Sequence, residues 1–98
     1  MEKKTPHCKL AVVKAMVEVG KVQTTKAARE GGTALGFDFD GMLAAVMGLT
    51  TADFYKSMTT RADHRVWQDV YRPTTPAGEV YMKLTVIGDV LIVSFKEL

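Results

Sequence analysis

Apolar residues in the first twenty positions recur at the spacing of a helix. The stripe consists of Leu10, Val13, Met16 and Val17. Because residues three or four positions apart lie on one side of a helix, this stretch predicts an amphipathic helix with one buried face. Thr5 followed by Pro6 suits its start, since proline is tolerated in the first helical turn, and Gly20 suits its end.

Before residue 50, the sequence predicts a short strand and two more helices. A brief strand is expected over residues 21–24, and Thr25 can cap a second helix, which the pair Gly31 and Gly32 is expected to break. A third helix is predicted from its cap, Asp38, to Gly48. Its apolar stripe consists of Met42, Leu43, Val46 and Met47.

The segment that follows begins with a capping signal. Thr50 and Asp53 have the spacing of a capping box, with the shorter acid in place of Glu. Such a box satisfies the free amides at the start of a helix. We therefore expect a short helix from here through Phe54 and Met58.

From residue 65 onwards, apolar and polar residues alternate, which is typical of half-buried strands. Strands are predicted over residues 65–72, 79–87 and 90–97. A proline-containing loop joins the first two, and a two-residue turn at Gly88 and Asp89 joins the last two. Helices followed by antiparallel strands predict an α+β fold: one compact domain over residues 1–98, with N-terminal helices packed on a mainly antiparallel C-terminal sheet.

The last turn also predicts which residues lie opposite one another. If Ile87 pairs with Val90, Tyr81 lies beside Lys96 on the polar face of the hairpin. Lys83 and Ser94 form the next pair on this face. On the apolar face the pairs are Val86 with Leu91, Leu84 with Val93, and Met82 with Phe95.

The strand over 65–72 extends the polar face if Arg72 lies opposite Glu79. Gln68 and Arg72 then share the face of Tyr81 and Lys96, whereas a shift by one residue would move both to the other side. Trp67 and Tyr71 alternate away from Gln68. They are therefore expected in the core rather than as stacking platforms, although both uses suit an aromatic side chain.

Composition limits the classes of protein to consider. A chain of 98 residues with 47% hydrophobic and 24% charged residues is typical of one globular domain. Its net charge of +2 allows nucleic-acid binding through a local patch without indicating it. The lone Cys8 excludes an internal disulfide, and charged residues interrupt each apolar run, so we expect a cytoplasmic protein without a membrane segment.

Long motifs in this chain resemble the MqsR family, the motility quorum-sensing regulator toxins. The motifs are MEKKTPH at the start, FDFDGM (37–42), DFYKSMTT (53–60), DH (63–64), WQDVYRP (67–73) and DVLIVSFKE (89–97). The resemblance spans the whole chain. It implies the toxin of a type II toxin-antitoxin pair, with a RelE-like ribonuclease fold. It also implies ribosome-independent cleavage of mRNA at GCU-like sites and neutralisation by a cognate MqsA-like antitoxin.

The resemblance also implies particular site residues. The family's proposed active-site residues match Lys56, Gln68 and Tyr81. Neighbouring positions implied in substrate binding are Tyr55, Met58, Arg72 and Lys96. No metal ion and no cofactor are expected at this site.

The chemistry of RNA cleavage suits these residue types. Without a metal, the 2′-hydroxyl must lose a proton, the charge on phosphorus must be stabilised, and the leaving oxygen must be protonated. Lys56 and Arg72 are candidates for phosphate stabilisation, and Tyr81 beside Lys96 is the candidate for proton transfer. Gln68 could hold the 2′-hydroxyl or a base edge, and Tyr55 offers a stacking face.

Other readings of the same residues remain open. Surface lysines and arginines usually serve solvation, and His7 with His64 could supply an acid-base pair instead. Zinc is less favoured, because Cys8 and the histidines lack paired-ligand spacing. Asp38 and Asp40 resemble the opening of a calcium loop, but capping suits them better. The alternative from another class is a non-catalytic regulatory module that binds nucleic acid or a partner protein through the same basic face.

The position of the antitoxin follows from the expected sheet. If the C-terminal strand lies at the sheet edge, its free backbone groups could pair with an antitoxin strand. Such binding would leave Lys56 and Gln68 untouched. We therefore expect antitoxin binding at a sheet edge, away from the active site.

Overall fold

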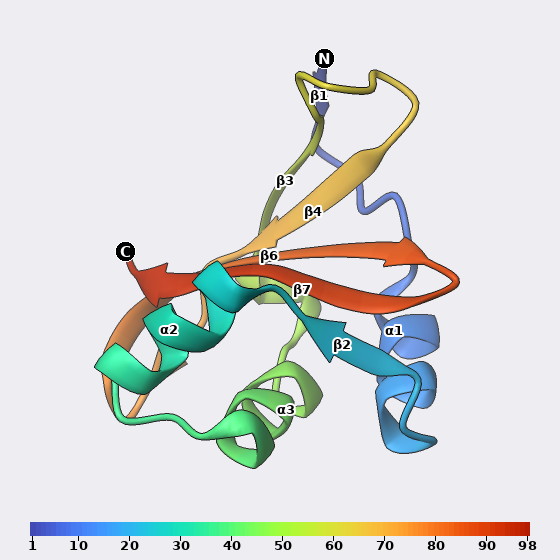
Figure 1. Ribbon diagram of the computed structural model, residues 1–98. Coiled ribbons are helices and arrows are strands. Elements are labelled where there is room, and N and C mark those ends of the chain that lie inside the picture. Colours follow the sequence, from blue (N-terminus) through green and yellow to red (C-terminus); the bar gives the residue numbers. More distant parts are fainter.

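Three helices lie on one side of a mixed sheet (Figure 1). The computed structural model describes residues 1–98. The helices are α1 (Leu10–Glu18), α2 (Lys26–Ala34) and α3 (Phe39–Met47), followed by a 3-10 turn, η1 (Thr51–Asp53). The strands are β1 (Glu2–Lys3), β2 (Val22–Thr24), β3 (Phe54–Thr59), β4 (Trp67–Tyr71), β5 (Thr74–Thr75), β6 (Gly78–Ile87) and β7 (Asp89–Glu97).

The strands form one sheet in the order β1-β3-β4-β6-β7-β2, with β5 paired to β6 outside this path. Every pair is antiparallel except β2 with β7. The predicted α+β class is therefore confirmed. The brief strand expected over 21–24 is also confirmed, as β2.

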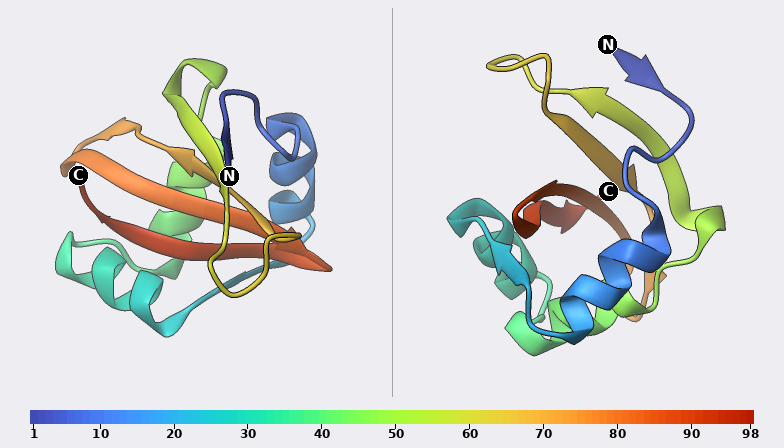
Figure 2. Two further views of the ribbon diagram at one scale, coloured as in Figure 1. Left: turned by 90° about the horizontal axis from the view of Figure 1, so that it is seen from above. Right: turned by 90° about the vertical axis from the view of Figure 1, so that its right-hand side faces the viewer.

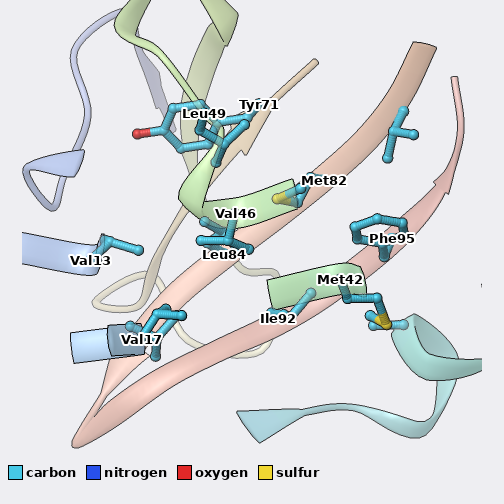
Figure 3. Packing of buried hydrophobic residues seen from close by; sticks show 13 residues of the cluster. Val13, Val17, Met42, Val46, Leu49, Tyr71, Met82, Leu84, Ile92 and Phe95 are labelled. Atoms are coloured by element: carbon cyan, nitrogen blue, oxygen red, sulfur yellow. The ribbon is translucent and has the colours of Figure 1, made fainter. Parts of the chain in front are cut away.

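The core lies between the helices and β4, β6 and β7 (Figure 3). It takes residues from α1 and α3 at helical spacing and alternate residues from β6, as the apolar pattern predicts. Its largest fully buried side chains are Tyr71, Phe95, Met42, Leu49, Met82 and Ile92. Burial of this apolar face is the main favourable contribution to folding, and it leaves the other face of the sheet for polar residues.

The first helix begins later than predicted. It starts at Leu10, and its N-cap residue, Lys9, makes no side-chain cap. The preceding residues instead run towards β4, where the backbone N–H groups of His7 and Cys8 donate to the Asp69 carboxylate at 2.9 and 3.0 Å. Asp69 is only 5% exposed, and a buried carboxylate needs such donors. The expected start at Thr5 and Pro6 is therefore wrong.

The second helix continues through the glycine pair that was expected to break it. Its cap is as predicted, with the Ala28 N–H donating to the Thr25 hydroxyl at 3.0 Å, but it ends at Ala34. A Cβ at Gly31 would lie 2.0 Å from the Phe95 carbonyl oxygen. Glycine here allows the helix backbone to approach β7 closely, which outweighs its low helix propensity.

The third helix agrees with the prediction from cap to end. The Gly41 N–H donates to the Asp38 carboxylate at 2.7 Å, and Gly48 is the C-cap. Asp38 is thus a helix cap, as the sequence favoured over a calcium ligand.

The predicted helix after Thr50 is a single 3-10 turn. The expected capping box forms, with the Thr50 N–H donating to the Asp53 carboxylate at 2.8 Å. Residues 54–59, however, form β3, which pairs with both β1 and β4. Sheet pairing on both sides therefore determines the structure beyond the cap.

A bulge changes the predicted register of the last hairpin. Near the turn, Ile87 lies opposite Asp89 rather than Val90, so only Gly88 remains at the apex, at a φ of 73°. The expected pairs Val86 with Leu91 and Leu84 with Val93 are wrong for the same reason. An irregularity between Lys83 and Leu84 restores the predicted pairs farther on: Lys83 with Ser94, Met82 with Phe95, and Tyr81 with Lys96.

The bulge also changes which β7 side chains reach the core. The buried residues are Val90, Ile92 and Phe95, whereas Leu91, Val93 and Phe95 were expected. One extra residue in a strand reverses the alternation beyond it. The prediction is therefore wrong for Leu91 and Val93 and confirmed for Phe95.

Strand β4 is displaced by two residues from its expected register. Tyr71 lies opposite Met82, whereas Arg72 opposite Glu79 would have placed Tyr71 opposite Val80. A shift of two preserves the face of each side chain. Tyr71 accordingly lies in the core, as predicted, and Gln68 stays on the opposite face. Trp67 is only half buried, with the His7 ring stacked on it at 5.7 Å.

Candidate active site

The predicted site residues gather on the sheet face that points away from the helices. In antiparallel strands, opposed residues share a face. One row across the sheet is Lys56, Val70, Lys83 and Ser94; flanking rows are Met58 with Gln68 and Tyr81 with Lys96. The structure thus brings Lys56, Gln68 and Tyr81 onto one face from three different strands.

A β-bulge places Tyr55 at the edge of this face. The register between β3 and β4 shifts between Phe54 and Lys56, which leaves Tyr55 without a partner. The residue is 40% exposed, and the Arg72 guanidinium lies 4.6 Å from its ring centroid. Bulges commonly redirect a side chain beside functional sites. Tyr55 and Arg72 also line an open pocket of about 240 Å³ with Glu79 and Leu98.

Two lysines flank Tyr81. The Nζ of Lys96 lies 5.3 Å from the Tyr81 ring centroid, and the Nζ of Lys83 lies 5.8 Å from it. Burial is the main cause of the lowered pKa of Lys83, and the charges of Lys96 and Lys56 lower it further. The charges of Lys56 and Lys96 thus both reach Lys83. A cluster of like charges of this kind is unfavourable unless an anion binds there.

Lys83 is a member of this cluster that sequence reasoning did not select. The predicted register already placed it beside Ser94, next to the pair of Tyr81 and Lys96. That neighbourhood was the available signal. Its place in the cluster also depends on Lys56 from β3, which lies in the same row on the other side of Val70.

Lys56 is held by an acidic partner from the N-terminal strand. Its Nζ donates to the Glu2 carboxylate. This hydrogen bond raises the pKa of Lys56 and lowers the pKa of Glu2 from their ordinary values. Lys56 is therefore a firmly protonated cation, suited to stabilising negative charge rather than accepting a proton.

The two histidines lie apart from this arrangement. His7 stacks on Trp67, which alternates away from Gln68 along β4 and so faces the opposite side of the sheet. His64 is exposed in the β3–β4 loop. No three His, Cys, Asp or Glu side chains gather in a group that could hold a metal ion.

The largest hollow in the molecule lies elsewhere. It has a volume of about 410 Å³ and is formed by α3 and the loop at 73–76. None of the predicted site residues lines it, so its size does not identify it as the reactive site.

No helix is long and apolar enough to span a bilayer.

Fold and site together define a small α+β protein with a cationic, tyrosine-bearing face on its sheet. The chain belongs to the motility quorum-sensing regulator toxin family. The family model described as "Motility quorum-sensing regulator, toxin of MqsA" matches residues 5–97. The chain is also similar to the mRNA interferase toxin MqsR of Escherichia coli (strain K12), with 59% identity over 97 residues, which cover 99% of each chain. The resemblance found in the sequence motifs is thus confirmed.

Proposed function

We propose that this protein is the toxin of a type II toxin-antitoxin pair, an endoribonuclease that cleaves mRNA. The observation that carries the proposal is its 59% identity, over nearly the whole chain, to a relative named as an mRNA interferase toxin. The cationic face supports it, because Lys56, Lys83 and Lys96 can stabilise the charge that develops on a phosphate during cleavage. The finer proposal is ribosome-independent cleavage at GCU-like sites in the cytoplasm, where the mRNA is translated.

We assign roles from the chemistry and position of each group. Lys56 stabilises the pentavalent phosphorus, because it is a protonated donor at the β3 end of the row that crosses the face. Tyr81, between Lys83 and Lys96, is the candidate for proton transfer. Gln68 positions the 2′-hydroxyl or a base edge through its donor and acceptor atoms. Tyr55 stacks on a base, while Arg72 grips a neighbouring phosphate.

The test is an RNA cleavage assay on the purified protein. We expect discrete cuts in an unstructured RNA containing GCU, in the presence of a chelator and without ribosomes. Lys56→Ala, Gln68→Ala and Tyr81→Ala should each reduce the cleavage rate by about 10² to 10⁴. Tyr81→Phe should show a comparable loss, because it removes only the hydroxyl.

Matched controls separate loss of function from loss of fold. Lys26→Ala removes a lysine that is 91% exposed on α2, and Gln23→Ala removes a glutamine from β2; both should cleave normally. Circular dichroism should be unchanged for all variants. Retention of RNA without any cleavage by the wild-type protein would instead favour the non-catalytic regulatory module. Full activity of all three site variants would refute the proposed site.

We further propose that an MqsA-like antitoxin binds at a sheet edge, but not at the edge expected from the sequence. Strand β7 is not an edge strand, because β2 pairs with it over Val90–Ile92. The edges are β1 and β2. Strand β2 is the better candidate, since β7, β6 and β4 separate it from Lys56 on β3, and a partner there would leave the cationic face unobstructed.

The free edge of β2 has defined bonding groups. The Lys21 carbonyl accepts from the Val90 N–H at 3.0 Å, and the Thr25 N–H donates to the Ile92 carbonyl at 3.0 Å. Backbone groups alternate in direction along a strand. Lys21, Gln23 and Thr25 therefore face β7, and the backbone groups of Val22 and Thr24 point outward, available to a partner strand.

A further inference from the structure

One acidic side chain reaches into the cationic face from the N-terminal arm, residues 1–8. Strand β1 pairs with β3, with Glu2 opposite Met58, so Glu2 lies on the same face as Lys56 and Gln68. Figure 1 shows β1 alongside β3 at the edge of the sheet. The Glu2 carboxylate accepts a hydrogen bond from the Lys56 Nζ, where the proposed function places a phosphate oxygen.

The arm that carries Glu2 is anchored on both sides of it. The Met1 amino group donates to the Thr59 hydroxyl at 3.0 Å. Farther along, the N–H groups of His7 and Cys8 donate to Asp69. The two views in Figure 2 show the arm running beside β3 towards α1. Glu2 is therefore held close to Lys56 by the backbone, which lowers the entropic cost of forming the pair.

Lys56 is the one cation of the face with a carboxylate partner. The ion pairs of the molecule are Lys56 with Glu2, Lys26 with Glu30, and Arg65 with Asp63. Lys83, Lys96 and Arg72 make none. The Lys56 side chain is 20% exposed and that of Glu2 56% exposed, so an incoming anion can reach the pair from solvent and exchange with the carboxylate.

We propose that Glu2 is a built-in competitor for the RNA phosphate, which occupies Lys56 in the free protein and must be displaced when RNA binds. This inference rests on the proposed function. Glu2 keeps the ammonium group directed onto the face in the absence of substrate, but reduces the affinity for RNA. It is a positioning residue that acts through Lys56 and takes no part in proton transfer.

The test compares steady-state kinetics of wild-type protein and Glu2→Gln, which keeps the size of the side chain and removes its charge. Glu2→Gln should lower KM for RNA about two- to fivefold, the range expected for an exposed ion pair, with little change in kcat. The difference in KM should disappear at high salt, because screening weakens exposed pairs. Glu18→Gln, an equal charge change at the end of α1 on the helical side, should leave KM as in the wild type.

A binding measurement tests whether Glu2 acts through Lys56. The probe is a 2′-O-methyl oligonucleotide containing GCU, which lacks the hydroxyl needed for cleavage. The Glu2→Gln protein should bind this probe more tightly than the wild type does. The same substitution should have no effect when Lys56→Met is already present, because the lysine for which Glu2 and the phosphate compete is then absent. Circular dichroism and thermal unfolding establish that each variant is folded.

Each other outcome is decisive. If wild-type protein cleaves RNA and Glu2→Gln leaves KM unchanged, the role of Glu2 is refuted and the proposed function stands. A raised KM, or a large loss of kcat, would show that Glu2 supports substrate binding or catalysis, and would also refute competition. If wild-type protein neither binds nor cleaves RNA, the proposed function fails and the competitor role fails with it.

Discussion

Tyr71 has a buried hydroxyl without a hydrogen-bond partner. The residue is 1% exposed, and its Oη has no donor or acceptor within reach. An unpaired buried polar group costs free energy, so Tyr71→Phe should raise the free energy of unfolding by about 1 kcal/mol. Urea unfolding at pH 7 measures this, with the more exposed Tyr55→Phe as a control that should change little. A loss of stability would show instead that the hydroxyl is hydrogen-bonded in solution.

The same residue gives the protein a dependence on alkaline pH. Burial raises the pKa of Tyr71 from 10.0 to about 12. Between these values the unfolded chain loses a proton that the folded protein retains, so stability falls as pH rises from 10 to 12. Tyr71→Phe lacks this contribution. Its advantage over the wild type should therefore grow across that range.

At the scale of residues, the sequence predicted which candidate site residues share a sheet face, but not the carboxylate that pairs with Lys56. The resemblance and the alternating pattern placed Gln68 and Tyr81 on one face, and that placement survives a register error of two residues because the error is even. Glu2 had no such signal. Its position depends on two amides of the arm binding Asp69 and on pairing of β1 with β3, and both are tertiary interactions.

At the scale of elements, the close approach of α2 to β7 depends on one glycine, Gly31. A Cβ at Gly31 would meet the Phe95 carbonyl oxygen, whereas one at Gly32 would meet the Met42 Sδ at 2.7 Å. Backbone cannot yield as easily as a flexible methionine side chain. Gly31→Ala should therefore be the more destabilising change, by about 2 kcal/mol or more, despite the better helix propensity of alanine.

Gly32→Ala is the matched control, since it adds the same methyl group one residue away on the same helix. We expect a cost below about 1 kcal/mol, because the Met42 side chain can adopt another rotamer. Thermal and urea unfolding of both variants measure the difference. Equal costs would mean that the helix can move away from Phe95, and that close approach is not the reason for glycine there.

Element types were predictable where one local signal dominated. Caps and apolar spacing predicted α3 from start to end, and alternation predicted β6 and β7. Prediction failed where distant pairing outweighed the local signal. Residues 54–59 pair with β1 and β4. In the last hairpin, the bulge allows one register beside the turn and another register farther along the two strands. The glycines of α2 were interpreted as breakers, because a close contact with Phe95 has no local signature.

At the scale of the whole molecule, the two faces of the sheet are separated by role. Helices α1, α2 and α3 cover one face and form the core with it, so the opposite face is free to carry the mutually repelling lysines. Repulsion among Lys56, Lys83 and Lys96 destabilises the fold, and burial of the core on the other face offsets it. A polyanion bound to this face would relieve that repulsion, so we expect RNA binding there to stabilise the fold.

The sheet edges provide a further division, between the proposed site and the proposed antitoxin surface on β2. Val22→Pro removes an outward N–H without breaking the bonds of Lys21 and Thr25 to β7, and should weaken binding of an MqsA antitoxin about tenfold, as expected for a lost backbone hydrogen bond. Val22→Thr keeps the amide and should bind normally.

Lys56→Ala and Gln68→Ala should bind as well as the wild type. Isothermal titration calorimetry measures all four. Loss of binding by a folded Lys56→Ala protein would mean that the antitoxin covers the cationic face directly.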